Sequence, residues 1–180
     1  MKKHLNLALV LGVVAIVAPS LRAQTFGPTG ATSLSVAVAA EAAISVTTAT
    51  TNLTAGATAF TNYTGSTSFS YKVRTSSGSG SGSITLEITT DFAPTGGPSV
   101  GSPLTGDTIS YTCSTSGVGT ACTGSQTPST TAQTNVLSFT KNIHSSKAGD
   151  SGSVSWTIPD DPAYPTGTYT ATATFTISAT

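Results

Sequence analysis

The stretch Tyr169-Thr-Ala-Thr-Ala-Thr-Phe-Thr-Ile-Ser-Ala-Thr180 decides the fold class, because apolar and hydroxyl side chains alternate along it without interruption. Successive side chains of a β-strand point to opposite faces, so this pattern predicts a strand with one buried face and one wet face. The turn residues Pro162, Pro165 and Gly167 precede it and mark where the strand begins.

The same two-residue alternation recurs along the rest of the chain. It is found in segments 33–46, 69–74, 84–88, 109–113, 137–139 and 154–158. Thr and Ser are weak helix formers, whereas β-branched residues favour strands. About seven strands separated by turns predict an all-β, immunoglobulin-like antiparallel β-sandwich.

A Ser/Gly-rich run, Ser76–Ser83, lies between two of these strands and contains Gly78, Gly80 and Gly82. It lacks the G-x-G-x-x-G spacing and the following helix that a phosphate-binding loop requires. The run therefore predicts a flexible hairpin loop.

Charge is scarce in this chain. Its 180 residues include seven basic and seven acidic side chains, 8% charged in all, while roughly a third of the positions are Ser or Thr. Globular proteins usually carry about 25% charged residues. Nucleic-acid binders need clustered Lys and Arg to meet phosphates, so we expect no nucleic-acid partner.

The first 23 residues have the layout of a cleavable secretory signal. Lys2, Lys3 and His4 precede an apolar run over 5–18, and a small-residue ending closes at Ala23. The run is shorter than the roughly 20 residues of a membrane span. We therefore predict a signal peptide over 1–23, no membrane span after cleavage, and a single β-sandwich domain over 24–180 that is secreted or displayed at the cell surface through the periplasm.

Both cysteines, Cys113 and Cys122, belong to the exported part of the chain. Export permits a disulfide, and the Gly-containing stretch 114–121 allows the two sulfurs to meet across a short loop. A zinc site needs about four ligands, whereas the mature chain offers these cysteines and one histidine. We predict a Cys113–Cys122 disulfide, the alternative being two free thiols, and neither a metal nor a cofactor.

Catalytic residues are hard to assemble from this sequence. His144, with Ser145, Ser146 and Asp150 nearby, lies in a polar segment that is typical of a loop, and no G-x-S-x-G elbow exists. Asp160 and Asp161 would face opposite ways on one strand, so they more simply end it and open the turn before Pro162; a calcium site there lacks a loop signature. We predict that the protein is not an enzyme.

Two segments carry a resemblance to known families. Ser33-Leu-Ser-Val-Ala-Val-Ala-Ala-Glu-Ala-Ala-Ile-Ser-Val46 and Pro165-Thr-Gly-Thr-Tyr-Thr-Ala-Thr-Ala-Thr-Phe-Thr-Ile-Ser-Ala-Thr180 resemble the first and last strands of spore coat protein U-type domains and chaperone–usher pilin subunits. The resemblance implies an incomplete sandwich that polymerises when the N-terminal strand of one subunit fills a groove in the next. It implies self-association or related subunits as partners, with a periplasmic chaperone and an usher. Those families usually carry a Cys in the first strand, where Ala43 stands here.

The apolar run at even positions from Leu34 to Val46 is unusually long. Its 13 residues would span about 43 Å, whereas a usual strand has five or six residues. We therefore treat 24–40 as a donor-strand extension. Its candidate strand-exchange residues are Leu34, Val36, Val38 and Ala40, while Ala42, Ile44 and Val46 begin the subunit's own first strand. The alternative is a single strand that bends and switches sheets within one monomer.

These features predict an exported structural or adhesive surface protein, such as a pilus or coat subunit. The competing class is a secreted carbohydrate-binding β-sandwich that recognises sugars through exposed aromatic side chains such as Tyr63 or Tyr164.

Overall fold

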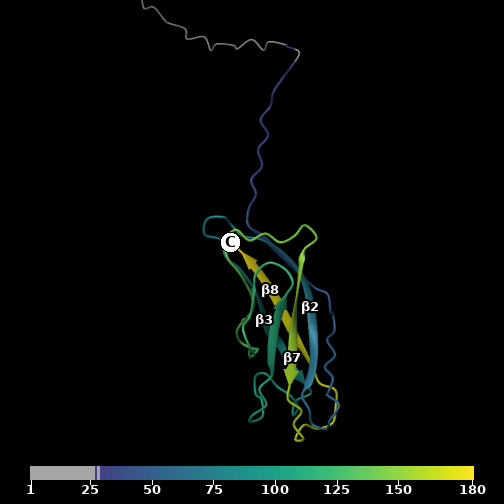
Figure 1. Ribbon diagram of the computed structural model, residues 1–180. Helices are drawn as coiled ribbons and strands as arrows, with labels where there is room; N and C mark the ends of the chain where they lie inside the picture. Colours follow the sequence, from purple (N-terminus) through teal and green to yellow (C-terminus); the bar gives the residue numbers. More distant parts are fainter. Residues whose placement is uncertain (1–26, 28) are drawn as a thin grey trace, which may run out of the picture. The chain divides into compact units, whose positions relative to one another are not determined.

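The computed structural model describes residue 27 and residues 29–180, and the signal peptide expected at 1–23 lies outside them. The described chain forms eight strands and no helix (Figure 1). They are β1 (Glu41–Val46), β2 (Tyr63–Arg74), β3 (Gly82–Ala93), β4 (Ser110–Thr115), β5 (Thr120–Ala121), β6 (Thr134–Phe139), β7 (Asp150–Ile158) and β8 (Thr170–Ala179). Within this part of the chain, no helix is long and apolar enough to cross a membrane.

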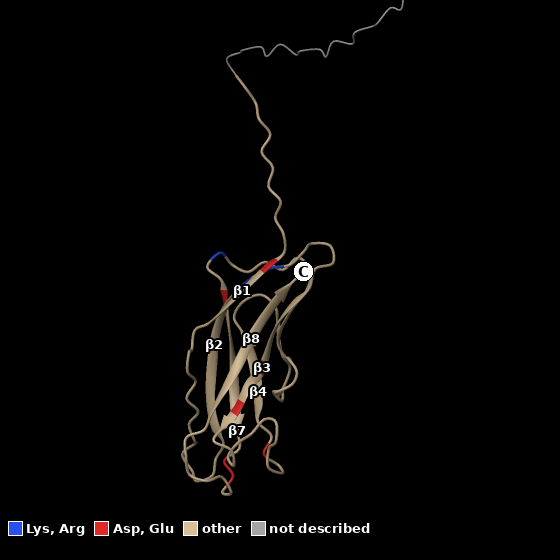
Figure 2. Ribbon diagram, turned by 180° about the vertical axis from the view of Figure 1, so that it is seen from behind, with Lys and Arg blue, Asp and Glu red and all other residues tan. Residues whose placement is uncertain are grey.

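The strands form two packed four-stranded sheets, so the predicted all-β sandwich is confirmed. One sheet has the order β1-β2-β7-β4 and the other β5-β6-β3-β8, with every neighbouring pair antiparallel. Figure 2 gives the reverse view, in which β1 and β4 are labelled. The first order matches the A-B-E-D sheet of immunoglobulin-like sandwiches, and the β3-β8 pair matches strands C and F. The two-residue β5 was not predicted from the sequence, because it is too short to show alternation.

The strand expected over 33–46 is shorter in the structure. β1 starts at Glu41, opposite Arg74 of β2, and continues to Val46, opposite Phe69. Since β2 ends at Arg74, the described residues just before Glu41 meet no neighbouring strand, and they have no regular secondary structure. Ala42, Ile44 and Val46 thus belong to the first strand, as predicted.

The Ser76–Ser83 run is not a hairpin, which corrects the sequence prediction. β2 pairs with β1 and β7, whereas β3 pairs with β6 and β8, so the run connects one sheet to the other. A side chain at Gly80 would collide with the backbone of Ser76 and Thr180. The glycine here permits close backbone approach rather than flexibility.

The core lies between the sheets and is built from the apolar faces of the alternating strands. Its most buried side chains are Phe69 and Tyr71 of β2, Ile84 and Leu86 of β3, Tyr111 of β4, Val136 and Leu137 of β6, and Val154 of β7. Phenol groups in this core keep partners, as buried hydroxyls must: Tyr71 donates to the Val118 carbonyl at 2.6 Å and Tyr111 to the Asn135 carbonyl at 2.9 Å.

The predicted disulfide between Cys113 and Cys122 is present, with a Cα–Cα distance of 5.4 Å. Cys113 lies on β4 of the first sheet, while Cys122 directly follows β5 and donates its backbone N–H to Val136 of the second sheet. A disulfide between cysteines nine residues apart can link the two sheets here because the short connection from β4 to β5 itself crosses between them.

Candidate functional site

β8 is one of the four edge strands of the two described sheets, together with β1, β4 and β5. β8 pairs with β3 on one side, and no strand of the described chain pairs with the other. In complete immunoglobulin-like sandwiches strand G occupies this position beside F. We call this unpaired side, with Ala171, Ala173, Phe175 and Ile177 on the inner face, the β8 edge.

The inward side chains of β8 are correspondingly less covered than those of its neighbour. Ile84, Leu86 and Ile88 of β3 are 0%, 0% and 4% exposed. The inward residues of β8 are all only partly buried, although they pack against the core. A strand with an unpaired backbone and a half-covered apolar face is a template for addition of another strand.

A cavity of about 830 Å³ opens beside the first residues of β8. We call it the base cavity. Its apolar lining comes from both sheets and includes Ile88, Trp156, Ile158, Ala171 and Ala173. It lies where β1 has ended, at Val46 opposite Phe69, so on that side the earlier half of β2 is flanked only by the segment after β1.

That segment contacts β2 through separate hydrogen bonds and not through a continuous strand ladder. The N–H groups of Thr47 and Thr48 donate to the Ser68 carbonyl. A backbone bridge joins Thr54 to Thr64, and the Thr51 and Thr67 hydroxyls lie 2.6 Å apart. Leu53 contacts the core but is only partly buried. The space between the sheets is therefore less filled here than beside β1.

The four predicted strand-exchange residues lie in a segment without regular structure, 34–40, which we call the entry segment. Its large apolar side chains are exposed: Leu34 at 92%, Val36 at 85% and Val38 at 64%. Ala40 is partly buried. Because these three apolar side chains lie in water, the free energy of burying them is not gained. Exposed apolar residues grouped in this way often mark an interaction site.

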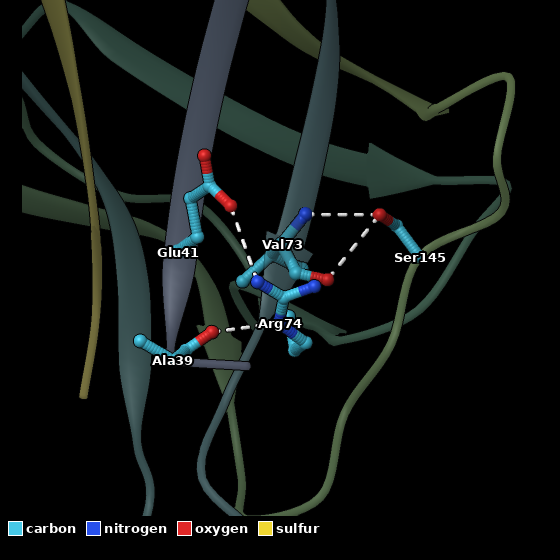
Figure 3. Close-up of polar contacts among 5 residues, drawn as sticks. All are labelled: Ala39, Glu41, Val73, Arg74 and Ser145. Atoms are coloured by element: carbon cyan, nitrogen blue, oxygen red, sulfur yellow. Dashed lines mark hydrogen bonds and ion pairs between the residues drawn. The ribbon is translucent and has the colours of Figure 1, made fainter. Parts of the chain in front are cut away.

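Arg74 holds the chain where it enters the sandwich (Figure 3). Its Nε donates to the Ala39 carbonyl at 2.7 Å, and its guanidinium lies 3.2 Å from a carboxylate oxygen of Glu41. On the other side of β2, Ser145 accepts from the Val73 N–H at 2.9 Å (Figure 3). These contacts define the point at which the entry segment leaves the fold.

The aromatic residues Tyr63 and Tyr164 both line the base cavity and are partly buried rather than fully exposed. Tyr164 donates to an Asp107 carboxylate oxygen at 2.6 Å. Burial and this carboxylate raise the Tyr164 pKa well above its ordinary range. Burial, followed by the charge and hydrogen bond of Asp160, also raises the pKa of Tyr63, so both phenols stay protonated at neutral pH.

The residues around His144 do not form a catalytic triad. The Ser145 hydroxyl bonds to the Val73 backbone, and that of Ser146 donates to the Gly149 carbonyl at 2.6 Å. Asp150 accepts from the backbone N–H groups of Val118 and Ser146, which lower its pKa against the opposing effect of burial. Each of these groups thus has a structural partner.

Asp160 and Asp161 follow β7, which ends at Ile158, and they open the predicted turn. Asp161 accepts from the Ala163 N–H at 2.7 Å, and both acids line the base cavity. In the described part of the chain, no group of three or more His, Cys, Asp or Glu is placed to hold a metal ion.

The sequence was compared with protein-family models, curated proteins and solved structures, and none of the three comparisons finds a match. Functional inference therefore depends on the site itself. One coarse statement about location follows from the chemistry: the Cys113–Cys122 disulfide indicates an oxidising, extracytoplasmic environment, because cytosolic thiols are kept reduced.

Proposed function

We propose that this protein is an exported, non-enzymatic surface subunit that assembles by strand donation. Two features of the described chain support the proposal: the β8 edge has no strand paired to it, and the apolar entry segment pairs with no strand. The entry segment of one copy adds to the β8 edge of the next. The product is a structural or adhesive filament or coat.

The entry segment has the right chemistry for this edge. Leu34, Val36 and Val38 alternate with Ser35 and Ala37, so an added strand directs the three large side chains to one face. That face covers the half-buried residues of β8, and the small residues between face solvent. Burying each large side chain contributes about 1.5–3 kcal/mol, while backbone hydrogen bonds to β8 satisfy groups otherwise left to water.

The likeness of the first and last strands to spore coat protein U-type domains and chaperone–usher pilins supports the same proposal. Those families place a periplasmic chaperone and an outer-membrane usher on the assembly route. We propose that a chaperone and an usher of these kinds also act on this protein. Covering the β8 edge before assembly is the task that such a chaperone would perform, since an uncovered apolar edge aggregates.

Paired substitutions on the two faces of the entry segment test the proposal. In the mature chain, Val36→Asp with Val38→Asp places two charges on the face that would be buried. The matched control, Ser35→Asp with Ala37→Asp, adds the same charges to the face that would stay wet. Sedimentation velocity and negative-stain microscopy should show assemblies for the wild type and the control, and monomers for the first variant. Equal assembly by both variants would refute strand donation.

A second function is favoured by the lining of the base cavity. Tyr63, Tyr164 and the 64%-exposed Phe60 gather there with Asp160 and Asp161, and aromatic faces with carboxylate acceptors suit a sugar. On this alternative the protein is a secreted carbohydrate-binding module. A monodisperse wild type that is retained on a polysaccharide column, and released by Tyr63→Ala, would favour it over the filament subunit.

A further inference from the structure

Most charged residues of the described chain lie at one or the other end of the sandwich (Figure 2). The end at which β1 begins, which we call the basic end, carries Lys72 and Arg74 on β2 and Lys141 and Lys147 in the connection from β6 to β7. Strand register places them together, because Arg74 pairs with Glu41 and Tyr71 pairs with Asp150 at the start of β7. Glu41 and Asp150 are the acidic residues at this end.

The opposite end, which we call the acidic end, carries Asp91, Asp107, Asp160 and Asp161, and no basic residue of the described chain lies there. It is the end at which β7 finishes and β8 begins, since Ile158 pairs with Tyr63 at the start of β2. β2 has 12 residues and therefore separates the ends by about 40 Å. Salt screens charges beyond about 10 Å, so the two ends do not neutralise each other within one copy.

Two carboxylates of the acidic end, Asp160 and Asp161, line the base cavity. The other two contact residues of its lining: Asp107 accepts the hydroxyl of Tyr164, and Asp91 accepts the N–H of Val100 at 2.9 Å. The charged side chains of the cavity lining are thus both negative.

The entry segment leaves the fold at the basic end. Arg74 holds its last residues through the Ala39 carbonyl, and Lys72 is two residues away on the same strand. Among described residues the Arg74–Glu41 contact is the sole ion pair, so Lys72, Lys141 and Lys147 have no acidic partner in their own copy. Exposed lysines without partners are available to another molecule.

We infer that copies of this chain stack end to end, the basic end of one on the acidic end of the next, with the base cavity as the mouth through which the entry segment of the second copy reaches the β8 edge. This inference rests on the proposed strand donation and adds its partner and its direction. The partner is a second copy of this chain, selected because the charges around the exit of the segment complement those around the cavity that receives it. The lysines of the donating copy face Asp160 and Asp161 of the receiving copy.

End-to-end stacking also sets the direction of the added strand. β8 runs from the acidic end to the basic end. The entry segment of the donating copy enters at the acidic end, and its C-terminal residues stay nearest to its own fold. It therefore runs antiparallel to β8. All neighbouring strands of the described sheets are also antiparallel. Val38 then lies nearest the base cavity, and Leu34 lies farthest along β8, toward Phe175 and Ile177.

Charge reversal at each end tests the inference. Lys141→Glu with Lys147→Glu makes the basic end acidic, and Asp160→Lys with Asp161→Lys reverses the charge at the two positions of the acidic end that line the base cavity. Each variant alone brings like charges together where the lysines of one copy would meet Asp160 and Asp161 of the next, so its association rate should fall about tenfold or more at low salt. An equimolar mixture should recover the rate, because every junction between the two variants is complementary. Glu87→Lys, midway along β3 and away from both ends, is the control and should associate like the wild type.

The outcomes separate this inference from the function on which it rests. If each reversed variant associates at the wild-type rate, or if the mixture stays as slow as its components, end-to-end stacking is overturned, while the Val36→Asp, Val38→Asp comparison still decides strand donation. If the wild type itself stays monomeric, both fail. Circular dichroism of each variant checks that it folds. If the Asp160→Lys, Asp161→Lys variant does not fold, the Lys141→Glu, Lys147→Glu variant still tests the inference, because both of its lysines are exposed.

Discussion

At the scale of single residues, the side chain of Trp156 depends on one hydroxyl group. Its Nε1 donates to Thr67 Oγ1 at 2.9 Å, and Thr67 is 7% exposed. Thr67→Val keeps the shape but leaves the indole N–H without its acceptor, which costs about 1–3 kcal/mol. We expect the free energy of unfolding, measured in urea, to fall by this amount. Thr64→Val, on the exposed face of the same strand, should change it by less than about 0.5 kcal/mol, and equal effects would contradict the assigned hydrogen bond.

Asp91 organises the connection after β3. Burial opposes its ionisation, but N–H groups of Val100 and Gly101, the Ser99 hydroxyl and the Phe92 N–H all donate to it, so its pKa lies below the ordinary 3.8. A lowered pKa stabilises the fold above that ordinary value, and the stabilisation is lost as the pH falls through the folded-state pKa.

Replacing this carboxylate should therefore have a pH-dependent effect. We expect Asp91→Asn to lower the free energy of unfolding by about 1–3 kcal/mol at neutral pH, and the difference from the wild type to shrink as the pH falls below 3.8. Urea unfolding at a series of pH values measures it. A difference that stays constant down to about pH 2 would show that the charge of Asp91 is not what matters.

At the scale of elements, the disulfide joins Cys113 of β4 to Cys122, directly after β5, and so couples the sheets. The two cysteines are nine residues apart in sequence. A disulfide that closes a loop of this length restricts the unfolded chain and adds about 2–3 kcal/mol to the free energy of unfolding. Cys113→Ala with Cys122→Ala should lower the free energy of unfolding by that amount, as should reduction of the wild type by a thiol. A stability unchanged by either treatment would contradict the contribution.

The strands themselves were predictable wherever one face is buried. Alternation located β2, β3, β7 and β8, because burial of one face imposes a two-residue period. The alternation continues from 33 to 46, but only Glu41–Val46 forms a strand in the subunit, because the partner strand β2 ends opposite Glu41. It missed β5, whose two residues are held by pairing with β6 and carry no pattern.

At the scale of the whole molecule, the sequence predicted the architecture but not the connections. Whether the Ser76–Ser83 run forms a hairpin or crosses between sheets depends on which strands β2 and β3 choose as partners, and those partners lie far away along the chain. Only one part of the candidate site, the entry segment, could be predicted from the sequence, because it is a continuous stretch whose alternation is visible. The base cavity combines residues from both sheets and forms only when the sheets pack together.

The division of charge between the ends was likewise hidden in the sequence. Lys72 and Lys147 are far apart along the chain, as are Asp91 and Asp161. Antiparallel strands bring each pair to one end of the sandwich. Composition alone showed scarce charge, and the fold shows that most of it is grouped.

The most direct test of the central claim is amide hydrogen exchange along β8 when a donor strand is supplied from outside. The mature Val36→Asp, Val38→Asp chain keeps its β8 edge but cannot donate. A synthetic peptide with the sequence of residues 32–42 is added to it, or the same peptide with the two aspartates. Strand donation predicts slower exchange across Thr170–Ala179 with the first peptide and no change with the second. Unchanged exchange along β8 with both peptides, or protection confined to another edge such as β4, would contradict it.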